Sequence, residues 1–298
     1  MNIIKKIVTL IMAPVIALTS AACVMNPAGP DDDGTFNIVT SFYPMQILVM
    51  NIAGGIDGVS VECMSEPDIG CIHDHVFSTS DLRMVENADV FVENGLELEL
   101  FNDQIKSAYP DLVIIEASED VTDAPSDGDE VNGHVWTSPA DYIIQIDTVA
   151  RALSAADPDH AAEYEANARE YAGRIEELIG RNEDASEILD GMRVLVLDET
   201  LPSFCEYFNM DYITLETDHE QSALSAGDLR DVIGSVNDNG IAAIFVTADG
   251  ENDIADTIAG ETGAVIYELN SCMTGEVYAD AYIDQMAENF DTLRGIAG

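Results

Sequence analysis

The residues best suited to chemistry in this chain are two histidines in distinctive surroundings. His73 lies in the phrase Gly-Cys-Ile-His-Asp-His and His134 in Asn-Gly-His-Val-Trp-Thr-Ser-Pro, in a chain with only five histidines. An acidic pair, Asp198-Glu199, directly follows an apolar run later in the sequence. Imidazole nitrogens bind Zn²⁺, Mn²⁺ and Fe²⁺, and a carboxylate adds the negative charge that a divalent ion requires. These residue types therefore predict a binding site for a transition metal.

Short β-rich apolar runs alternate with helical patterns from Phe36 to the end of the chain. We expect strands at residues 36–42, 59–64, 89–93, 111–117, 192–197, 212–215, 242–246 and 264–269. We expect helices at residues 43–53, 80–88, 96–107, 139–155, 202–208, 226–236, 253–262 and 279–293. This alternation predicts parallel sheets covered by helices on both faces. The expected fold class is therefore α/β, with two similar lobes, each a parallel sheet flanked by helices.

A single long helix is expected to join the two lobes. It should begin after Asp157-Pro158-Asp159, a helix N-terminal signal, and extend over residues 160–189. Five apolar residues at alternating spacings of four and three line one of its faces: Tyr164, Ala168, Tyr171, Ile175 and Leu178. At 1.5 Å per residue this length corresponds to roughly 45 Å, which is more than one small lobe needs.

These patterns divide the chain into five parts. They are a signal peptide at 1–22, a tether at 23–35, an N-terminal α/β lobe at 36–137 with an acidic loop at 118–132, a helical segment with the bridging helix at 138–190, and a C-terminal α/β lobe at 191–298. Ligands of open parallel sheets bind beyond the carboxyl ends of the strands, where His73 and Asp198-Glu199 lie. His134 enters a helix from the acidic loop and can face the same cleft, so we expect the site between the lobes.

The N-terminal residues have the features of an export signal. Lys5 and Lys6 precede an apolar run from Ile7 to Leu18, and small residues lead to Cys23. We therefore expect an extracytoplasmic protein. No other apolar run approaches the roughly 20 residues that span a bilayer. The small residues before Cys23 resemble the lipobox of bacterial lipoproteins, which implies a lipid on Cys23 that anchors the protein to the outer face of the cell membrane. Cleavage with a free Cys23 is the alternative, because Ser20 occupies a position where leucine is usual.

The charge of the chain is extreme, with 57 acidic and 11 basic residues and a net charge of −46. Such a surface disfavours nucleic acid and anionic lipid as partners and enriches cations nearby. It does not by itself make a metal site. Carboxylates dispersed over the whole chain, with lysine nearly absent, are typical of adaptation to high salt or of an acidic proteome.

Four cysteines follow Cys23: Cys63, Cys71, Cys205 and Cys272. Cys63 and Cys71 could close a disulfide across the loop before His73, or both could be unpaired thiols. A third and least favoured alternative is that Cys71, two residues before His73, binds metal as a thiolate.

Several phrases together resemble one known family, the metal-specific extracytoplasmic solute-binding proteins of ABC importers, in the zinc and manganese group that also contains proteins once called adhesins. The likeness covers nearly all of the chain after the signal peptide, and its strongest element is His134-Val135-Trp136 followed by Pro139. The other phrases are Ser41-Phe42-Tyr43-Pro44, His73 with Ser80-Asp81-Leu82, Glu86 to Gly95, Glu261-Thr262-Gly263-Ala264, and Asp280-Ala281-Tyr282-Ile283.

The resemblance implies a set of metal ligands. His73 and His134 match the first two, Asp198 falls at the third with Glu199 beside it, and Asn270 falls at the fourth, where the family usually has an aspartate. Asn270 is a departure, because asparagine offers only a neutral carbonyl oxygen, so water or Glu199 could complete the coordination.

The loop at 118–132 corresponds to the histidine-rich loop of many zinc-specific members, but here it is acidic and contains no histidine. Another departure is His75, where the family more often has an aromatic residue; we expect it beside the ligands or in solvent. His219, in Asp218-His219-Glu220, is expected to be a solvated loop residue, with replacement of a missing ligand as the alternative.

The expected function is therefore that of a binding protein and not of an enzyme. A monomer captures a divalent metal ion as cargo, Zn²⁺ more than Mn²⁺, and delivers it to the membrane permease of an ABC importer. A metal-buffering or adhesion lipoprotein is the alternative. A zinc hydrolase is less favoured, because the sequence contains neither a His-Glu-x-x-His motif nor a nucleophile elbow.

Overall fold

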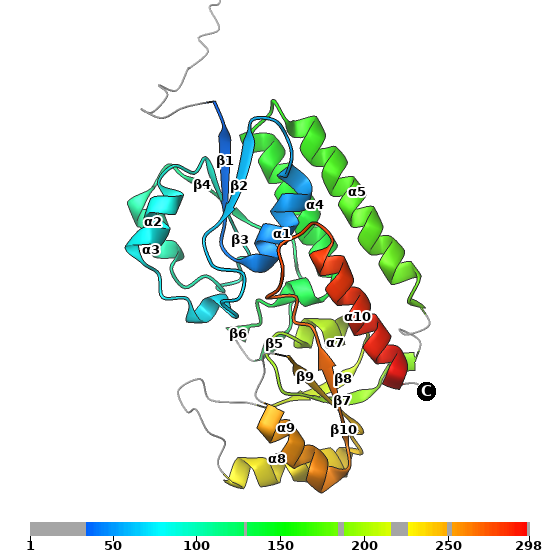
Figure 1. The fold of residues 1–298 in the computed structure, drawn as a ribbon. Coiled ribbons are helices and arrows are strands. Elements are labelled where there is room, and N and C mark those ends of the chain that lie inside the picture. Colours follow the sequence, from blue (N-terminus) through cyan, green and yellow to red (C-terminus); the bar gives the residue numbers. More distant parts are fainter. Residues whose placement is uncertain (1–33, 128–129, 184–187, 216–225, 249–251, 297–298) are drawn as a thin grey trace, which may run out of the picture. The chain divides into compact units, whose positions relative to one another are not determined.

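The computed structural model describes residues 34–127, 130–183, 188–215, 226–248 and 252–296 (Figure 1). The expected signal peptide, Cys23, most of the tether and His219 lie outside these residues. Thr35 to Gly298 form one unit of the chain. Within the described residues, none of the helices combines the length and the apolar character needed to cross a membrane.

The first sheet consists of four parallel strands. They are β1 (Phe36–Thr40), β2 (Val59–Cys63), β3 (Val90–Glu93) and β4 (Val113–Glu116), arranged in the order β2-β1-β3-β4 (Figure 1). Every residue of the internal strand β3 is buried. The sequence of such a strand is a nearly continuous apolar run because helices cover both of its faces.

The second sheet has the same topology. Its parallel strands are β7 (Arg193–Val196), β8 (Asp211–Thr214), β9 (Ala243–Thr247) and β10 (Val265–Leu269), in the order β10-β9-β7-β8. Read from its other edge, the order is β8-β7-β9-β10, which matches β2-β1-β3-β4. The expected α/β fold with two similar lobes is confirmed.

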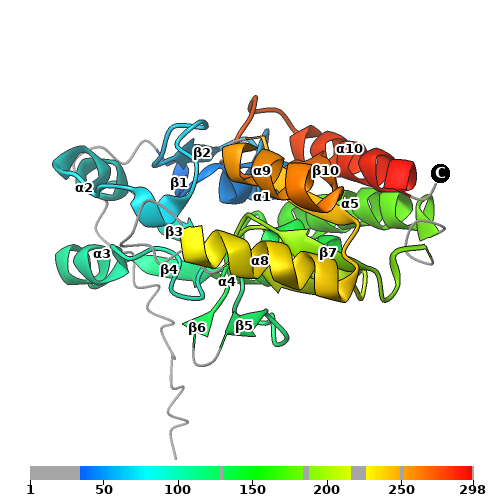
Figure 2. The same ribbon diagram turned by 90° about the horizontal axis from the view of Figure 1, so that it is seen from below.

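Helices and single turns connect the strands. The first lobe contains α1 (Tyr43–Ala53), α2 (Thr79–Val85), α3 (Asn102–Ala108) and the 3₁₀ turn η1 (Ile72–Asp74). The second contains α7 (Pro202–Tyr207), α8 (Ala226–Asn239), α9 (Asn252–Thr262) and α10 (Ala281–Ile296). Helices α8 and α9 lie side by side (Figure 2), and α10 packs against β10, α5 and α1.

Two antiparallel helices, α4 (Pro139–Ala156) and α5 (Ala161–Gly180), follow the 3₁₀ turn η2 (Val135–Thr137). The five expected residues of α5 are all buried, and α5 packs against α4, α1 and α10 (Figure 1). It is about 30 Å long and ends at Gly180, not at Leu189 as predicted. The helix stops there because glycine is a weak helix former and the Asn182 side chain donates to the Leu178 carbonyl, in competition with the backbone.

Two other elements differ from expectation. The helix expected at 96–107 begins only at Asn102, because Gly95, Leu96 and Glu97 all have positive φ angles of 83°, 54° and 62°, which no right-handed helix permits. The acidic loop at 118–132 contains a short antiparallel pair, β5 (Ser126–Asp127) and β6 (Glu130–Val131).

The core connects the lobes. Along β7, Val194 and Val196 join the large core that also contains the first sheet, α4 and α5, whereas Leu195 faces a smaller core with α8 and α9. This alternation follows from the two-residue period of a strand. One face of the second sheet therefore shares a continuous apolar core with the first lobe.

Candidate metal centre

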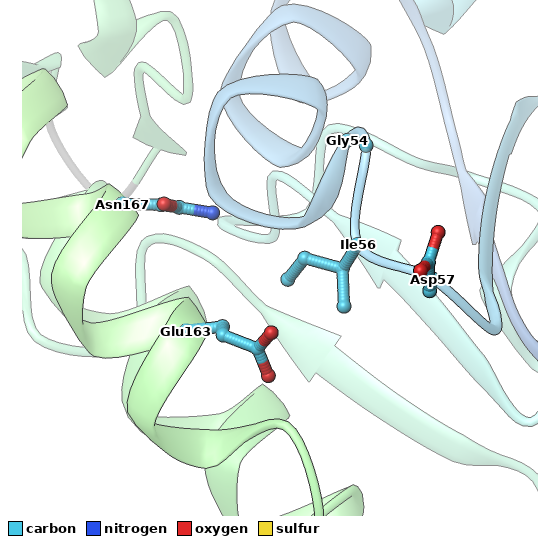
Figure 3. A pocket seen from close by; sticks show the side chains of 6 residues that line it. Gly54, Ile56, Asp57, Glu163 and Asn167 are labelled. Carbon is cyan, nitrogen blue, oxygen red and sulfur yellow. The ribbon is translucent and has the colours of Figure 1, made fainter.

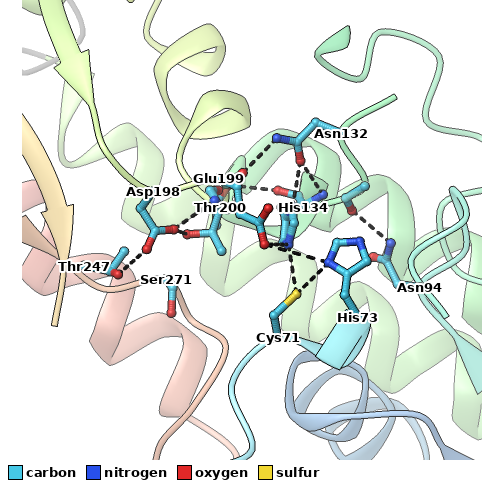
Figure 4. A network of polar contacts seen from close by, with 12 residues as sticks. Cys71, His73, Asn94, Asn132, His134, Asp198, Glu199, Thr200, Thr247 and Ser271 are labelled. Atoms are coloured by element: carbon cyan, nitrogen blue, oxygen red, sulfur yellow. Dashed lines mark hydrogen bonds and ion pairs between the residues drawn. The ribbon is translucent and has the colours of Figure 1, made fainter. Parts of the chain in front are cut away.

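Four side chains converge between the two lobes: Cys71, His73, His134 and Glu199 (Figure 4). One ligand atom from each lies within 4.8 Å of all the others. Glu199 Oε1 is 3.8 Å from His73 Nδ1 and 3.7 Å from His134 Nε2. Cys71 Sγ is 2.9 Å from His73 Nδ1 and 3.4 Å from His134 Nε2.

Different elements carry these side chains to one place. Cys71 and His73 lie in the connection that follows β2, with His73 inside η1. His134 is the N-cap residue of η2, and Glu199 lies in the turn after β7. Both lobes therefore contribute donor atoms, and those after β2 and β7 follow the carboxyl ends of parallel strands.

Asn132 holds His134 in one orientation. Its Oδ1 accepts hydrogen bonds from the His134 backbone N–H, at 2.9 Å, and from the ring Nδ1–H, at 2.8 Å. Its Nδ2 donates to the Glu199 carbonyl at 2.8 Å. With Nδ1 protonated, the lone pair of Nε2 faces the group, as is usual for a histidine that binds metal. Asn132 was not among the residues singled out in the sequence, where its closeness to His134 was the only available signal.

The environment of His134 keeps its imidazole neutral. The residue is 2 % exposed, and its ring packs edge-on against Trp136 and His73 at centroid distances of 5.2 and 5.4 Å. Burial, followed by the nearby His73, lowers the pKa of His134 to about 3. A buried imidazole resists protonation because the charged form loses its hydration. His134 therefore presents a free lone pair at neutral pH.

The turn η2 is fixed to the second lobe by its own side chains and carbonyls. Trp136 is completely buried, and its Nε1–H donates to the Ser271 carbonyl at 3.0 Å. The Tyr282 hydroxyl donates to the Trp136 carbonyl at 2.9 Å, and the Thr137 hydroxyl donates to the Thr200 carbonyl at 2.8 Å. The position of His134 is thus determined by both lobes.

The structure does not bring Asp198 into the group. Its carboxylate accepts from the Thr200 backbone N–H at 2.9 Å, from the Thr200 hydroxyl and from the Thr247 hydroxyl (Figure 4). These donors lie at the carboxyl ends of β7 and β9 and draw the carboxylate into the second lobe. The neighbouring Glu199 occupies the position near the histidines for which Asp198 was expected.

Asn270 is also directed elsewhere. Its Nδ2 donates to the Glu288 carboxylate at 3.0 Å and to the Gln285 carbonyl at 3.3 Å, both on α10. Its backbone N–H donates to Asn289 Oδ1 at 2.6 Å. These bonds direct the amide nitrogen of Asn270 to α10.

The structure also shows the surroundings of the cysteines and of His75. Cys63 and Cys71 are not joined by a disulfide, so that alternative is wrong for this structure. His75 Nε2 lies 3.1 Å from an oxygen of Asp81. Because Asp81 also closes the capping box of α2, His75 belongs to the entrance of that helix.

The geometry of the group suits a tetrahedral ion. With bonds of about 2.0–2.3 Å to nitrogen, oxygen and sulfur, neighbouring ligand atoms of a Zn²⁺ ion lie roughly 3.3–3.8 Å apart. Three of the four distances given above fall between 3.4 and 3.8 Å. These spacings are compatible with a small divalent ion held between the four side chains.

A separate hollow of about 400 Å³ lies beside the C-terminal end of α1 (Figure 3). It is lined by Gly54, Gly55, Ile56 and Asp57, and by Glu163 and Asn167 of α5. The Asn167 side chain donates to the Ile52 carbonyl. With neither histidine nor cysteine in its lining, this hollow has no connection with the metal-ligand group.

Two α/β lobes of the same topology, with a group of side chains able to hold a metal ion between them, have the architecture of metal-specific extracytoplasmic solute-binding proteins. The chain belongs to the family described as "Zinc-uptake complex component A periplasmic" (ZnuA), whose model matches residues 38–295.

Known proteins agree with this assignment. The chain is 28% identical over 304 residues to the manganese-binding lipoprotein MntA of Halalkalibacterium halodurans, with 97% of each chain covered. It is 29% identical over 253 residues to the iron-binding protein YfeA of Yersinia pestis, covering 83% of this chain and 79% of the other. Its fold matches the SBP FpvC of P. aeruginosa, solved in complex with Ni²⁺, with a TM-score of 0.77 and 26% identity over 88% of this chain and 97% of the other.

Proposed function

We propose that this protein captures a divalent transition metal ion, Zn²⁺ in preference to Mn²⁺, and delivers it to the permease of an ABC importer. The observation that carries the proposal is the convergence of two imidazole nitrogens and a carboxylate oxygen from both lobes within 4.8 Å. His73, His134 and Glu199 are the proposed ligands, and Asp198 and Asn270 are left out because they are bonded within the second lobe.

We also propose a cellular location for the protein. Membership of a periplasmic family and the likeness to a lipoprotein support an extracytoplasmic location. We propose that Cys23 carries the lipid anchor and that the protein acts as a monomer. Labelled fatty acid should be incorporated by the wild type and not by Cys23→Ala, and light scattering of protein without its signal peptide should give the mass of one chain.

The choice of metal follows from the family and from the ligands. Related proteins are named for manganese, iron and zinc, so relatives alone do not select the ion. Two imidazoles and one carboxylate form the open three-ligand set that Zn²⁺ uses in many proteins, and the family is described as a component of zinc uptake. We therefore infer Zn²⁺ as the main cargo.

Elemental analysis of protein purified without added metal tests this site. We expect about one equivalent of metal, chiefly zinc, in the wild type and a strong loss in His73→Ala and in His134→Ala. His75→Ala is the matched control, because its Nε2 faces Asp81, and it should keep its metal. Full metal content in both His73→Ala and His134→Ala would contradict the assignment of the site.

Deletion of the gene distinguishes import from storage or adhesion. Loss of an importer component should produce a growth defect that added zinc relieves. Loss of a metal buffer should instead increase sensitivity to zinc, and loss of an adhesin should leave growth unchanged at all zinc concentrations.

A further inference from the structure

We infer that Cys71 is the fourth ligand of the metal ion, so that the cargo is bound by one thiolate, two imidazoles and one carboxylate. The consequence is selectivity for thiophilic divalent ions such as Zn²⁺, Cd²⁺ and Co²⁺ over Mn²⁺. This inference rests on the proposed function, and it concerns the chemical class of the ion that the same site accepts.

The position of the sulfur is the first argument. Cys71 Sγ is within 3.4 Å of one ring nitrogen of each histidine, and Figure 4 shows it below both rings, on the side toward which Glu199 also points. Four donor atoms that lie within 4.8 Å of one another form a closed group around a common centre. A sulfur placed there takes a corner of the coordination polyhedron.

The other cysteines of the described chain have different surroundings. Cys205 and Cys272 are buried to 0% and 2% exposure inside the large core. The Cys63 sulfur lies 4.0 Å from the Ser65 hydroxyl oxygen. Among the four, Cys71 alone has imidazole nitrogens as its partners, so its location is not a general property of cysteine in this fold.

Within the part of the chain that the structure describes, the two other ligands expected from the sequence make hydrogen bonds elsewhere. Asp198 is held by Thr200 and Thr247, and Asn270 by residues of α10. A tetrahedral site with only His73, His134 and Glu199 would need a solvent molecule at its last corner. Cys71 already lies at that corner.

The charge balance of the site also favours a thiolate ligand. A thiolate and a carboxylate together balance the two positive charges of the ion, and two neutral imidazoles leave that balance unchanged. A partly buried site of zero net charge avoids the desolvation penalty of an isolated ion. Thiolate is also a soft ligand, which binds Zn²⁺ and similar ions well and suits Mn²⁺ poorly, since Mn²⁺ prefers oxygen.

Cobalt spectroscopy tests the sulfur directly. We would titrate metal-free protein with Co²⁺ alone and record the visible d–d bands together with the near-ultraviolet band of sulfur-to-cobalt charge transfer. The wild type should show both. Cys71→Ser, which changes only sulfur to oxygen, should lose the charge-transfer band, whereas the control Cys63→Ser should keep it.

Each other outcome decides the question. Cobalt d–d bands in the wild type without charge transfer would overturn the thiolate inference and leave the proposed metal-capture function standing. A charge-transfer band that persists in Cys71→Ser would do the same. No cobalt binding at all in the wild type would overturn both.

A substitution that exchanges ligand chemistry tests the selectivity. Cys71→Asp puts a hard carboxylate in place of the soft thiolate, so competition titrations with Zn²⁺ and Mn²⁺ should show the affinity ratio moving toward Mn²⁺ by about tenfold or more. The variant still binds metal, so a loss of folding would be visible as a loss of both ions. An unchanged zinc-to-manganese ratio would contradict the inference.

Discussion

At the scale of single residues, Asn132 links two of the proposed ligands, His134 and Glu199, which come from different lobes. Its carbonyl oxygen fixes the tautomer and orientation of His134, and its amide nitrogen holds the backbone of Glu199. Hydrogen-bond partners of ligands typically change metal affinity by about 10- to 100-fold when removed. Asn132 is therefore a positioning residue whose two functional groups can be separated by mutation.

Asn132→Ala should weaken Zn²⁺ binding by about 10- to 100-fold, because the His134 ring loses its orienting acceptor. Asn132→Asp should lose less, since its Oδ1 still accepts from His134 and only the donor to the Glu199 carbonyl is gone. Competition with a chromophoric chelator measures both affinities. Equal losses in the two variants would show that the Glu199 contact, and not the orientation of His134, is what matters.

A second residue-scale feature is the buried carboxyl of Glu93 at the end of β3. The residue is 0% exposed. Burial, then repulsion by Glu99 and Glu116, raises the pKa of Glu93 to about 8, and burial raises the pKa of Glu99 to about 7. In the folded protein these groups hold protons at a pH where they would lose them in the unfolded chain.

The raised pKa of Glu93 makes the stability of the folded protein depend on pH. Between the unfolded pKa near 4.5 and the folded pKa of about 8, the folded state binds more protons, so the contribution of Glu93 to stability decreases as pH rises. Glu93→Gln should flatten the fall of the unfolding free energy between pH 5 and 8, by an amount on the order of 2 kcal/mol. Urea denaturation at several pH values measures this, with the exposed Glu86→Gln as control. Equal slopes in both variants would contradict the assignment.

At the scale of elements, η2 is the connection that joins the lobes at the site. Trp136, Thr137 and the Trp136 carbonyl make hydrogen bonds to Ser271, Thr200 and Tyr282 of the second lobe. The Trp136 ring also packs edge-on against Phe42 at 5.2 Å. A short turn with this many buried partners carries His134 as a rigid support.

Tyr282→Phe tests this support. It removes a buried hydroxyl that donates to the Trp136 carbonyl, and we expect a loss of about 1–3 kcal/mol in unfolding free energy. Tyr278→Phe is the matched control, because that tyrosine is 41% exposed and its hydroxyl contacts Asp284 at the surface. Urea unfolding should leave Tyr278→Phe close to the wild type. An equally small loss in Tyr282→Phe would mean that η2 does not depend on this bond.

The sequence predicted the strands and most helices because their apolar runs are set by burial on both faces. It missed the start of α3, because nothing local reveals that Glu99 is buried. Its carboxylate accepts from Ser41 Oγ and from the Asn94 and Gly95 backbone N–H groups, and the chain around it takes left-handed angles. The spacing of apolar residues in the sequence does not predict such contacts between distant segments.

Part of the candidate metal site could likewise be predicted from the sequence. His73, His134 and Glu199 were named from their phrases and from their places after strands, and the structure brings them together. The choice between Asp198 and Glu199 depended on the Thr247 hydroxyl, which comes from a strand far along the chain. For Cys71 the sequence supplied closeness to His73 but not the distance to His134.

At the scale of the whole molecule, charge repulsion is the dominant electrostatic feature. Eleven basic residues cannot neutralise 57 acidic ones. Ion pairs such as Lys106–Glu116 and Arg193–Asp211 are largely exposed and contribute little each. A net charge of −46 destabilises the folded state by self-repulsion, which dissolved cations screen.

Stability should therefore increase with salt. We expect the midpoint of thermal unfolding to rise by several degrees between 0.1 M and 2 M KCl, whereas most of the screening should already be complete near 1 M, where the Debye length is about 3 Å. Sucrose at matched osmolality is the control for general exclusion effects. A rise of the same size in sucrose would show that screening is not the cause.

The identical strand order of the lobes has a consequence for what can be bound at all. In each sheet the crevice between the two strands where the order reverses is the usual place for a nucleotide or a sugar phosphate. Here a carboxylate of the protein itself fills each crevice: Glu99 between β1 and β3, and Asp198 between β7 and β9. In each half a carboxyl group of the protein therefore takes the place where a phosphate binds in other open α/β sheets. The side chains that converge as a possible metal-binding group lie instead at the junction of the two lobes.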